Sequence, residues 1–300
     1  MARVCLRKKM SGDLLLLDGA MGTELLARRA DAGGCNERLN IESRDTVLAV
    51  HRAYLEAGSD AVLTNTFGAN RFLLGRHGLA GQVGRLNAAG AEVAREAAGE
   101  ERYVLGDIGP SGDFLQPVGT LDAGELEEAF CEQAAALVGG AVDGLIIETM
   151  TALEEMAIAV RAVKSVCGDL PVLASMSFEK RGDDFRTMMG VSVEAAVSKL
   201  VSLGVDAVGF NCGTASLDEY VELAEQLVET AGAASAEVPI LAEPNAGRPE
   251  LADGRAVYRV SPGDFAAAAE KMCSAGVSII GGCCGTGPAH IEALAGALAR

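Results

Sequence analysis

The chain has 300 residues, of which 49% are hydrophobic and 22% are charged, and its formal net charge is −17. A chain of this length can bury a large core, and its acidic surface lacks the basic side chains that neutralise nucleic-acid phosphates or attract anionic lipids. We therefore expect a globular protein that binds neither nucleic acid nor membrane.

The N-terminal segment is basic and then apolar, like the start of a signal peptide. Its apolar run covers only residues 14–17 and ends at Asp18, whereas a secretory signal needs roughly 7–15 apolar residues. No run approaches the ~18 apolar residues of a membrane span. We expect a cytoplasmic protein whose eight cysteines are reduced thiols or metal ligands. Residues 1–12 are expected to be a flexible N-terminal extension of one domain over residues 1–300.

Short apolar runs rich in Val, Ile and Leu recur along the chain, each followed by glycine or a polar residue. Continuous runs of this kind, without apolar–polar alternation, are typical of parallel strands buried on both faces. The eight runs are residues 14–19, 61–67, 103–109, 144–150, 171–178, 207–213, 239–247 and 277–285.

Stretches rich in Ala, Glu and Leu separate these runs, and several begin with a Ser or Asp cap and end with Gly, as helices do. Examples are residues 43–58, 123–140, 192–204 and 216–232. Eight strands alternating with helices predict an α/β fold, a single (β/α)8 TIM barrel, rather than an open doubly wound sheet. Residues 70–84 and 179–190 are expected to be long loops over the barrel mouth.

The functional groups of a parallel barrel stand at the C-terminal ends of its strands. Polar groups or thiols follow all eight runs, but no run ends in the Lys of a Schiff-base aldolase or in a metal-binding His. The residues at these ends are Asp18, Asn65, Thr66, Asp107, Glu148, Ser177, Asn211, Cys212, Glu243, Asn245, Cys283 and Cys284.

Three of these strand-end residues are cysteines: Cys212 ends the sixth strand, and Cys283 and Cys284 end the eighth. Nearby strands of a small barrel open onto the same mouth, so the three thiols are expected to converge there. Three thiolates suit Zn²⁺ and leave a fourth position open for a substrate. A single cysteine is more often a small buried hydrophobe, the role expected for those at the terminus or on helices. These are Cys5, Cys131, Cys167 and Cys273, while Cys35 remains unassigned.

The glycines around the pair Cys283–Cys284 leave another interpretation open. Gly281 and Gly282 precede the thiols, and Gly287 with Pro288 marks the start of a helix. Glycines followed by a helix N-terminus also describe the phosphate site of many barrels. A phosphate-binding isomerase or synthase, a non-catalytic zinc or thiol carrier, and an iron–sulfur site are therefore alternatives.

The remaining strand ends suit an amino acid, whose ammonium needs an anion and whose carboxylate needs donors. Asp18 and Glu148 supply negative charge, and the turn through Gly19, Ala20 and Met21 offers backbone N–H groups. For Glu148, pairing with an Arg or Lys at the edge of the core is the alternative. Packing or surface roles are expected for the three histidines, His51, His77 and His290.

From about Asp13 to its C-terminus the chain resembles the homocysteine S-methyltransferase family. The motifs that carry the resemblance are LDGAMGTEL, TNTFGANR, GDIGPSG, IIETM, FNCG, EPNAGRP and IIGGCCGTGPAHI. Within the family, the chain is most similar to the homocysteine-binding domain of cobalamin-dependent methionine synthases. It departs from that pattern in FNCGTASLDE and over residues 179–190.

The resemblance implies zinc-dependent methyl transfer to the thiol of homocysteine, giving methionine. One zinc would lie on Cys212, Cys283 and Cys284, with Asn245 as fourth ligand until substrate arrives, and no catalytic residue is expected beyond this site. The implied methyl donor is methylcobalamin on a separate corrinoid protein, with S-methylmethionine or betaine as the alternative. The expected substrate contacts are Asp18, Gly19, Ala20, Met21, Thr66, Glu148 and Asn211.

Overall fold

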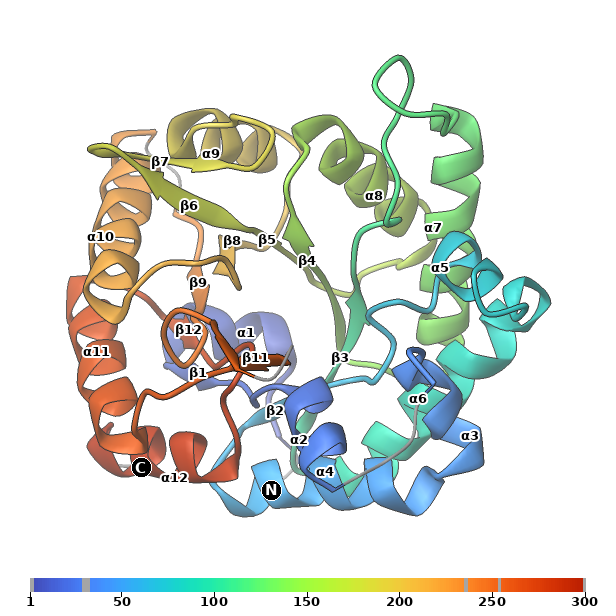
Figure 1. Ribbon diagram of the computed structural model, residues 1–300, viewed down its shortest axis with the longest axis horizontal. Helices are drawn as coiled ribbons and strands as arrows, with labels where there is room; N and C mark the ends of the chain where they lie inside the picture. Colours follow the sequence, from blue (N-terminus) through green and yellow to red (C-terminus); the bar gives the residue numbers. More distant parts are fainter. Residues whose placement is uncertain (1–2, 29–32, 235–236, 253–254, 299–300) are drawn as a thin grey trace.

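The computed structural model describes residues 3–28, 33–234, 237–252 and 255–298. Eight parallel strands form one sheet that curves into a barrel, and helices surround it (Figure 1). The predicted (β/α)8 TIM barrel is confirmed, and each of the eight predicted runs contains one of its strands. These strands are β1 (Leu15–Leu16), β2 (Ala61–Leu63), β3 (Tyr103–Ile108), β4 (Gly144–Met150), β5 (Val172–Met176), β8 (Ala207–Asn211), β9 (Ile240–Glu243) and β12 (Ile279–Ile280).

The barrel closes between β1 and β2 through carboxylates. The strand order is β1-β12-β9-β8-β5-β4-β3-β2. Across the seam, the Asp60 N–H donates to the Leu16 carbonyl at 2.7 Å, and the Asp60 carboxylate accepts from the Leu16 N–H at 3.0 Å. Nearer the mouth, the Asp18 carboxylate accepts from the Leu63 N–H at 3.1 Å. Closure of the barrel therefore also fixes Asp18 at its mouth.

The helices pack their apolar faces on the outside of the sheet, and Ser or Asp residues cap several of them. The side chains of Asp122, Ser192, Ser216 and Ser261 accept hydrogen bonds from first-turn N–H groups. None of the described helices is long and apolar enough to cross a membrane. The helices are α1 (Leu6–Gly12), α2 (Met21–Ala27), α3 (Leu39–Glu42), α4 (Arg44–Glu56), α5 (Arg71–Gly75), α6 (Val83–Ala98), α7 (Ala123–Gly139), α8 (Leu153–Val166), α9 (Val193–Ser202), α10 (Leu217–Ala233), α11 (Pro262–Ala275) and α12 (Pro288–Ala297), with short 3₁₀ turns η1 (Asn36–Arg38) and η2 (Ala80–Gln82).

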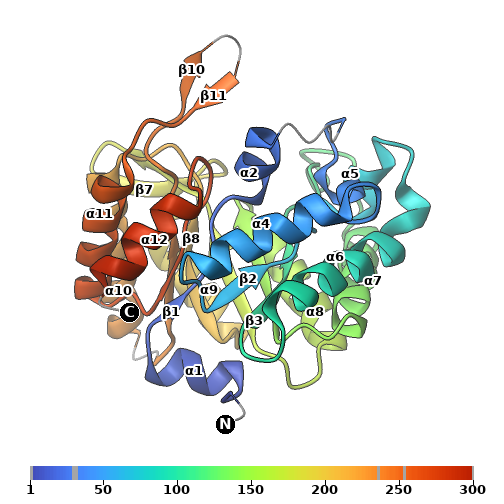
Figure 2. The ribbon, with the colours of Figure 1, turned by 90° about the horizontal axis from the view of Figure 1, so that it is seen from below.

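The N-terminal segment differs from the flexible extension expected over residues 1–12. Residues 6–12 form α1, which lies at the end of the barrel opposite the β10–β11 hairpin (Figure 2). Leu6 and Met10 are each only 3% exposed and join the apolar cluster inside the barrel. Two apolar residues four apart give this basic helix one face that covers the closed end of the barrel. Residues 1 and 2 lie outside the described residues.

Several segments at the mouth are more regular than expected. Residues 179–190 do not form a simple loop, because β6 (Phe178–Arg181) and β7 (Asp184–Thr187) pair as an antiparallel hairpin. Phe178 and Phe185 are buried and anchor this hairpin. Residues 70–84 contain α5 and η2. A further hairpin, β10 (Glu250–Ala252) with β11 (Arg255–Val257), was not predicted and projects from the mouth (Figure 2).

His51 makes the stability of the protein sensitive to acid. Its side chain on α4 is fully buried, neither ring nitrogen has a hydrogen-bond partner in the structure, and burial lowers its pKa to about 4. An unfolded histidine titrates near ~6.5, so this contribution to stability is complete above that pH and is lost as the pH falls towards 4. Between pH 7 and 5 the metal-free protein should lose about 2 kcal/mol more unfolding free energy than His51→Leu does. Urea unfolding of both proteins at the two pH values measures this difference, and equal losses would contradict the assignment.

Candidate active site

Three cysteine side chains converge at the centre of the barrel mouth. The sulfur of Cys284 lies 3.9 Å from that of Cys212 and 4.0 Å from that of Cys283. All three sulfurs lie within 4.8 Å of one another. Tetrahedral ligands at a Zn–S distance of ~2.3 Å are about 3.8 Å apart, so the spacing and the donor set fit a zinc ion with one position left for another ligand. The predicted convergence is confirmed, while occupancy by zinc stays a prediction.

Cys212 is held in a backbone conformation that non-glycine residues rarely adopt. Its φ is +57°, in the left-handed region. Its N–H donates to the Glu243 carbonyl at 3.2 Å, and its carbonyl accepts from the Tyr220 hydroxyl at 2.7 Å. The Tyr220 ring stacks on Phe210 with centroids 5.7 Å apart. Strand β9 and helix α10 therefore hold the backbone of Cys212 in place.

Cys283 and Cys284 are fixed by the turn between β12 and α12. The Cys283 N–H donates to the Pro244 carbonyl at 2.9 Å, and the Cys284 carbonyl accepts from the Ala246 N–H at 2.9 Å. Gly285 follows with a φ of +81°, and a Cβ there would lie 2.2 Å from the ring of Tyr258. Tyr258 therefore packs directly over the turn, and its side chain helps to lower the pKa of the Cys284 thiol.

The crowding of the three thiols controls their ionisation. Hydrogen bonds from Cys212 and then from Cys283 lower the pKa of Cys284. Hydrogen bonds with Cys212 and then with Cys284, together with burial, raise the pKa of Cys283. Without a cation, the cluster holds its first negative charge on Cys284 and resists a second one about 4 Å away. A divalent cation would allow all three sulfurs to ionise together.

Asn245 lies beside the thiols with an unused acceptor. Its Nδ2 donates to the Gly213 carbonyl at 2.7 Å and lies 3.9 Å from the Cys212 sulfur. Its Oδ1 is buried and has no hydrogen-bond partner. Buried amide oxygens are rarely left unpaired, so this atom fits the predicted role of a fourth ligand.

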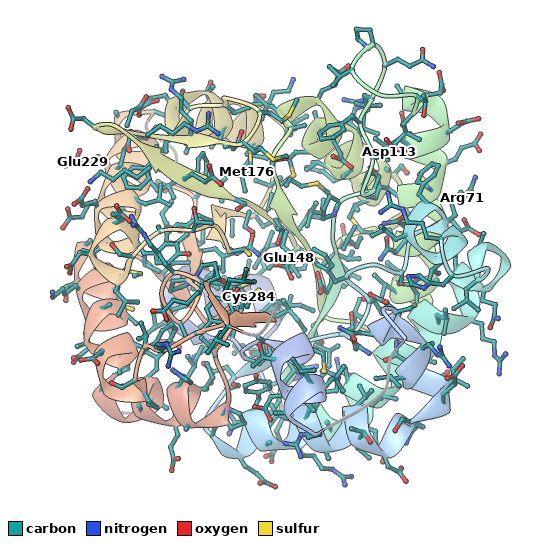
Figure 3. All side chains as sticks on the ribbon, in the orientation of Figure 1. Arg71, Asp113, Glu148, Met176, Glu229 and Cys284 are labelled. Atoms are coloured by element: carbon teal, nitrogen blue, oxygen red, sulfur yellow. The ribbon has the colours of Figure 1, made fainter. Side chains whose placement is uncertain are left out.

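A cavity of about 250 Å³ borders the cysteines. This volume lies at the small end of ligand sites and suits a molecule of amino-acid size. Figure 3 shows Glu148 and Cys284 together at the centre of the ring of strands, and both line this cavity. The predicted contacts Asp18, Gly19, Ala20, Met21, Thr66 and Glu148 all line it as well.

The cavity wall is strongly acidic. Five acidic residues and no Lys, Arg or His are found among the described residues that line it. Burial raises the pKa of Glu148 to about 7 and raises those of Asp18, Asp107 and Glu243 well above their usual range. Such a wall favours a cationic group and disfavours a phosphate, which counts against the phosphate-binding alternative. Glu148 therefore has no Lys or Arg to pair with among the described lining residues.

Asp107 and Glu243 were recognised in the sequence as strand ends but were given no role. In the structure, Asp107 Oδ1 and Glu243 Oε2 are buried without a hydrogen-bond partner, and both residues line the cavity. Their position at the C-terminal ends of β3 and β9 was the only signal of a role. They can accept hydrogen bonds from a ligand cation beside Glu148.

Two predicted substrate contacts have other partners. The Thr66 hydroxyl donates to the Asp107 carbonyl at 2.7 Å and is bonded to the Thr64 hydroxyl at 2.6 Å, so it orders the cavity wall. Asn211 is fully buried but does not line the cavity. The previously unassigned Cys35 is buried and donates to Glu37 at 3.3 Å, which indicates a structural role.

Comparison with known proteins identifies the family. The homocysteine S-methyltransferase family model matches residues 15–298. The chain belongs to the homocysteine S-methyltransferase family. Membership confirms the resemblance found in the sequence motifs.

Individual family members agree with this assignment. Methionine synthase of Mycobacterium tuberculosis is 36% identical over 308 residues, which cover 97% of this chain and 25% of that protein. Its counterpart in Mycobacterium leprae is 36% identical over 94% of this chain. The chain thus spans about a quarter of the length of these relatives. The metallated homocysteine methyltransferase MmuM of Escherichia coli is 24% identical, with a TM-score of 0.75 over 94% of this chain and 95% of that one, and shares the fold.

Proposed function

We propose that this barrel catalyses zinc-dependent transfer of a methyl group to the thiol of homocysteine, giving methionine. The observation that carries the proposal is a cluster of three thiols at the edge of a small, acidic cavity. Family membership, a cation site made of sulfur and a wall suited to an ammonium group all agree with a substrate that has a thiol at one end and an amino group at the other.

The cavity offers separate places for the two charged groups of the amino acid. Glu148 and Asp18 face its interior together with Asp107 and Glu243, and these carboxylates would surround the ammonium. The described residues of the lining include no basic side chain, so the substrate carboxylate would accept from backbone N–H groups. Helix α2 begins at Met21, and the N–H groups of its first turn have no acceptor within the helix.

Cys212, Cys283 and Cys284 would hold the zinc, with Asn245 as fourth ligand in the absence of substrate. When bound, Zn²⁺ would keep the homocysteine thiol ionised at neutral pH, whereas a free thiol with a pKa of ~8.5 is only a few per cent thiolate. The carboxylates orient the substrate so that its sulfur lies at the cysteine cluster and its methylation proceeds from the open side of the mouth. This positioning needs no general base among the described residues.

The methyl donor we propose is methylcobalamin carried on a corrinoid protein, and the surface around the mouth supports this choice. Seven large hydrophobic side chains are exposed among the described residues, and all except Val4 lie on segments that follow strand ends at the mouth. Exposed apolar side chains gathered on one face are typical of a protein interface. The six at the mouth, called here the rim residues, are Leu26, Phe114, Val118, Met188, Met189 and Leu251.

Incubating the zinc-loaded protein with homocysteine and each donor in turn tests both parts of the proposal. Methionine, detected by mass spectrometry, should form with a methylated corrinoid protein and not with S-methylmethionine or betaine. Exclusive use of either small donor would contradict the corrinoid donor and leave homocysteine methylation intact. Failure with every donor would contradict the proposed activity itself.

Charged substitutions at the rim should affect only the carrier-borne donor. Met188→Glu combined with Val118→Glu should slow transfer from the corrinoid protein by about tenfold, the effect of losing a modest interface contact. Transfer from free methylcobalamin should be unchanged, because the cavity is untouched. Val4→Glu, an exposed apolar position near α1, is the matched control and should transfer from both donors like the parent.

A further inference from the structure

Asn211 occupies the last position of β8, directly before Cys212, and every polar atom of its side chain is engaged. Its Oδ1 accepts from the Thr149 N–H at 2.7 Å and from the Ser175 hydroxyl at 2.5 Å. Its Nδ2 donates to the Thr149 hydroxyl at 2.6 Å and to the Glu148 carboxylate, and lies 3.8 Å from the Cys283 sulfur. This one amide therefore contacts both the acidic wall and the thiol cluster.

The same side chain braces the backbone on both sides of the site. Thr149 and Cys212 have φ values of +59° and +57°, which non-glycine residues adopt only when their surroundings hold them there. Asn211 binds the backbone N–H of Thr149 and is covalently bonded to Cys212. Glu148 and Cys212 are thereby kept in register across β4, β5 and β8, since Ser175 of β5 also bonds to the amide.

The contacts of Nδ2 provide a route for coupling. An amide group has two N–H hydrogens, but three acceptors surround this one: Glu148, the Thr149 hydroxyl and the Cys283 sulfur. When a substrate ammonium binds Glu148, it takes over part of the hydrogen bonding to that carboxylate. An N–H of the Asn211 amide can then form a stronger hydrogen bond to the Cys283 sulfur. Hydrogen bonds to the side chains that hold a metal orient those ligands and tune the affinity of the site.

We propose that Asn211 is a positioning residue that couples ammonium binding at Glu148 to the metal ligand Cys283. The inference rests on the proposed function, since it takes Glu148 as the ammonium partner and the cysteines as metal ligands. Binding of the substrate amino group at Glu148 then strengthens binding of the substrate thiol at the metal site. Homocysteine is therefore bound more tightly than the sum of these two interactions would give. Asparagine is required because the position needs a donor and an acceptor on one short, neutral side chain.

The test compares Asn211→Asp with the parent in the zinc-loaded protein. Aspartate keeps the acceptor for Thr149 and Ser175 but replaces the donor with an oxygen that faces Glu148 and Cys283. Chelator competition should show zinc affinity at least about tenfold lower, as for other residues that bond to metal ligands. Calorimetry with homocysteine and with 4-mercaptobutyrate, which lacks the amino group, should show a preference for homocysteine that falls at least about fivefold.

Two further variants separate coupling from a general loss of stability. Asn87→Asp is the matched control, because Asn87 is equally buried but does not line the cavity, and it bonds only to the backbone carbonyls of Ala69 and Val83. Ser175→Ala removes only the hydroxyl that orients the amide, and it should shift both measurements in the same direction by a smaller amount. It keeps the test decisive if Asn211→Asp does not fold.

The outcomes are distinct. A lowered homocysteine preference in Asn211→Asp or Ser175→Ala, with Asn87→Asp like the parent, supports the coupling. Parent-like zinc affinity and preference in the Asn211 and Ser175 variants would overturn it while leaving the proposed function in place. A parent that binds neither zinc nor homocysteine would overturn both.

Discussion

Replacing Cys283 with serine is expected to remove bound zinc and to abolish methyl transfer to homocysteine. Cys283 is one of only three sulfurs in the cluster and lies 4.0 Å from Cys284. Structural zinc sites bind with ~10–16 kcal/mol, so losing one of three thiolates should weaken binding by roughly 3–5 kcal/mol, or about 10²–10⁴-fold. Metal analysis of protein purified under reducing conditions without chelator should find about one zinc per chain in the parent and little in the variant.

Cys131→Ser is the matched control for this experiment. Cys131 lies on α7, its sulfur contacts the Ala162 carbonyl at 3.6 Å, and it does not line the cavity. It should retain zinc and activity, whereas Cys212→Ser and Cys284→Ser should behave like Cys283→Ser. Parent-like zinc content in all three cluster variants would contradict the metal site, whatever activity remained.

Replacing Glu148 with glutamine is expected to weaken homocysteine binding strongly while leaving zinc in place. Glutamine keeps the shape and an acceptor for Asn211 but removes the charge that would pair with the substrate ammonium. Truncating one partner of a buried charge pair costs ~2–5 kcal/mol, so kcat/KM for homocysteine should fall by about 10²-fold or more. Steady-state kinetics and calorimetry with the zinc-loaded variant measure the loss.

The specificity of the effect is checked with a second ligand and a second glutamate. Binding of 4-mercaptobutyrate, which has no amino group, should change little in Glu148→Gln. Glu155→Gln is the matched control, because Glu155 is a buried glutamate on α8 that accepts from Ser111 at 2.8 and 2.6 Å outside the cavity. If Glu148→Gln weakened both ligands equally, the carboxylate would not be the ammonium partner.

The sequence alone was sufficient for the barrel and for the metal-ligand candidates. Continuous apolar runs such as residues 144–150 identify buried parallel strands, and a closed parallel barrel has only one mouth, so its strand ends meet there. This is why Cys212 and the pair Cys283–Cys284, about 70 residues apart in the chain, were expected to converge and do so. The motifs that surround them were sufficient to indicate the family.

Only the tertiary structure decided which strand-end side chains face the cavity and which serve each other. Asp107 and Glu243 are left with unpaired buried oxygens. The amide of Asn211, in contrast, is bonded to Thr149 of β4 and Ser175 of β5 and contacts Cys283, which follows β12. Side-chain direction and hydrogen-bond pairing across strands depend on register and backbone angles, and the strand pattern carries neither. The helix α1 and the β10–β11 hairpin were missed for a related reason: each is too short for a periodic signal, and α1 is stabilised by the barrel it covers.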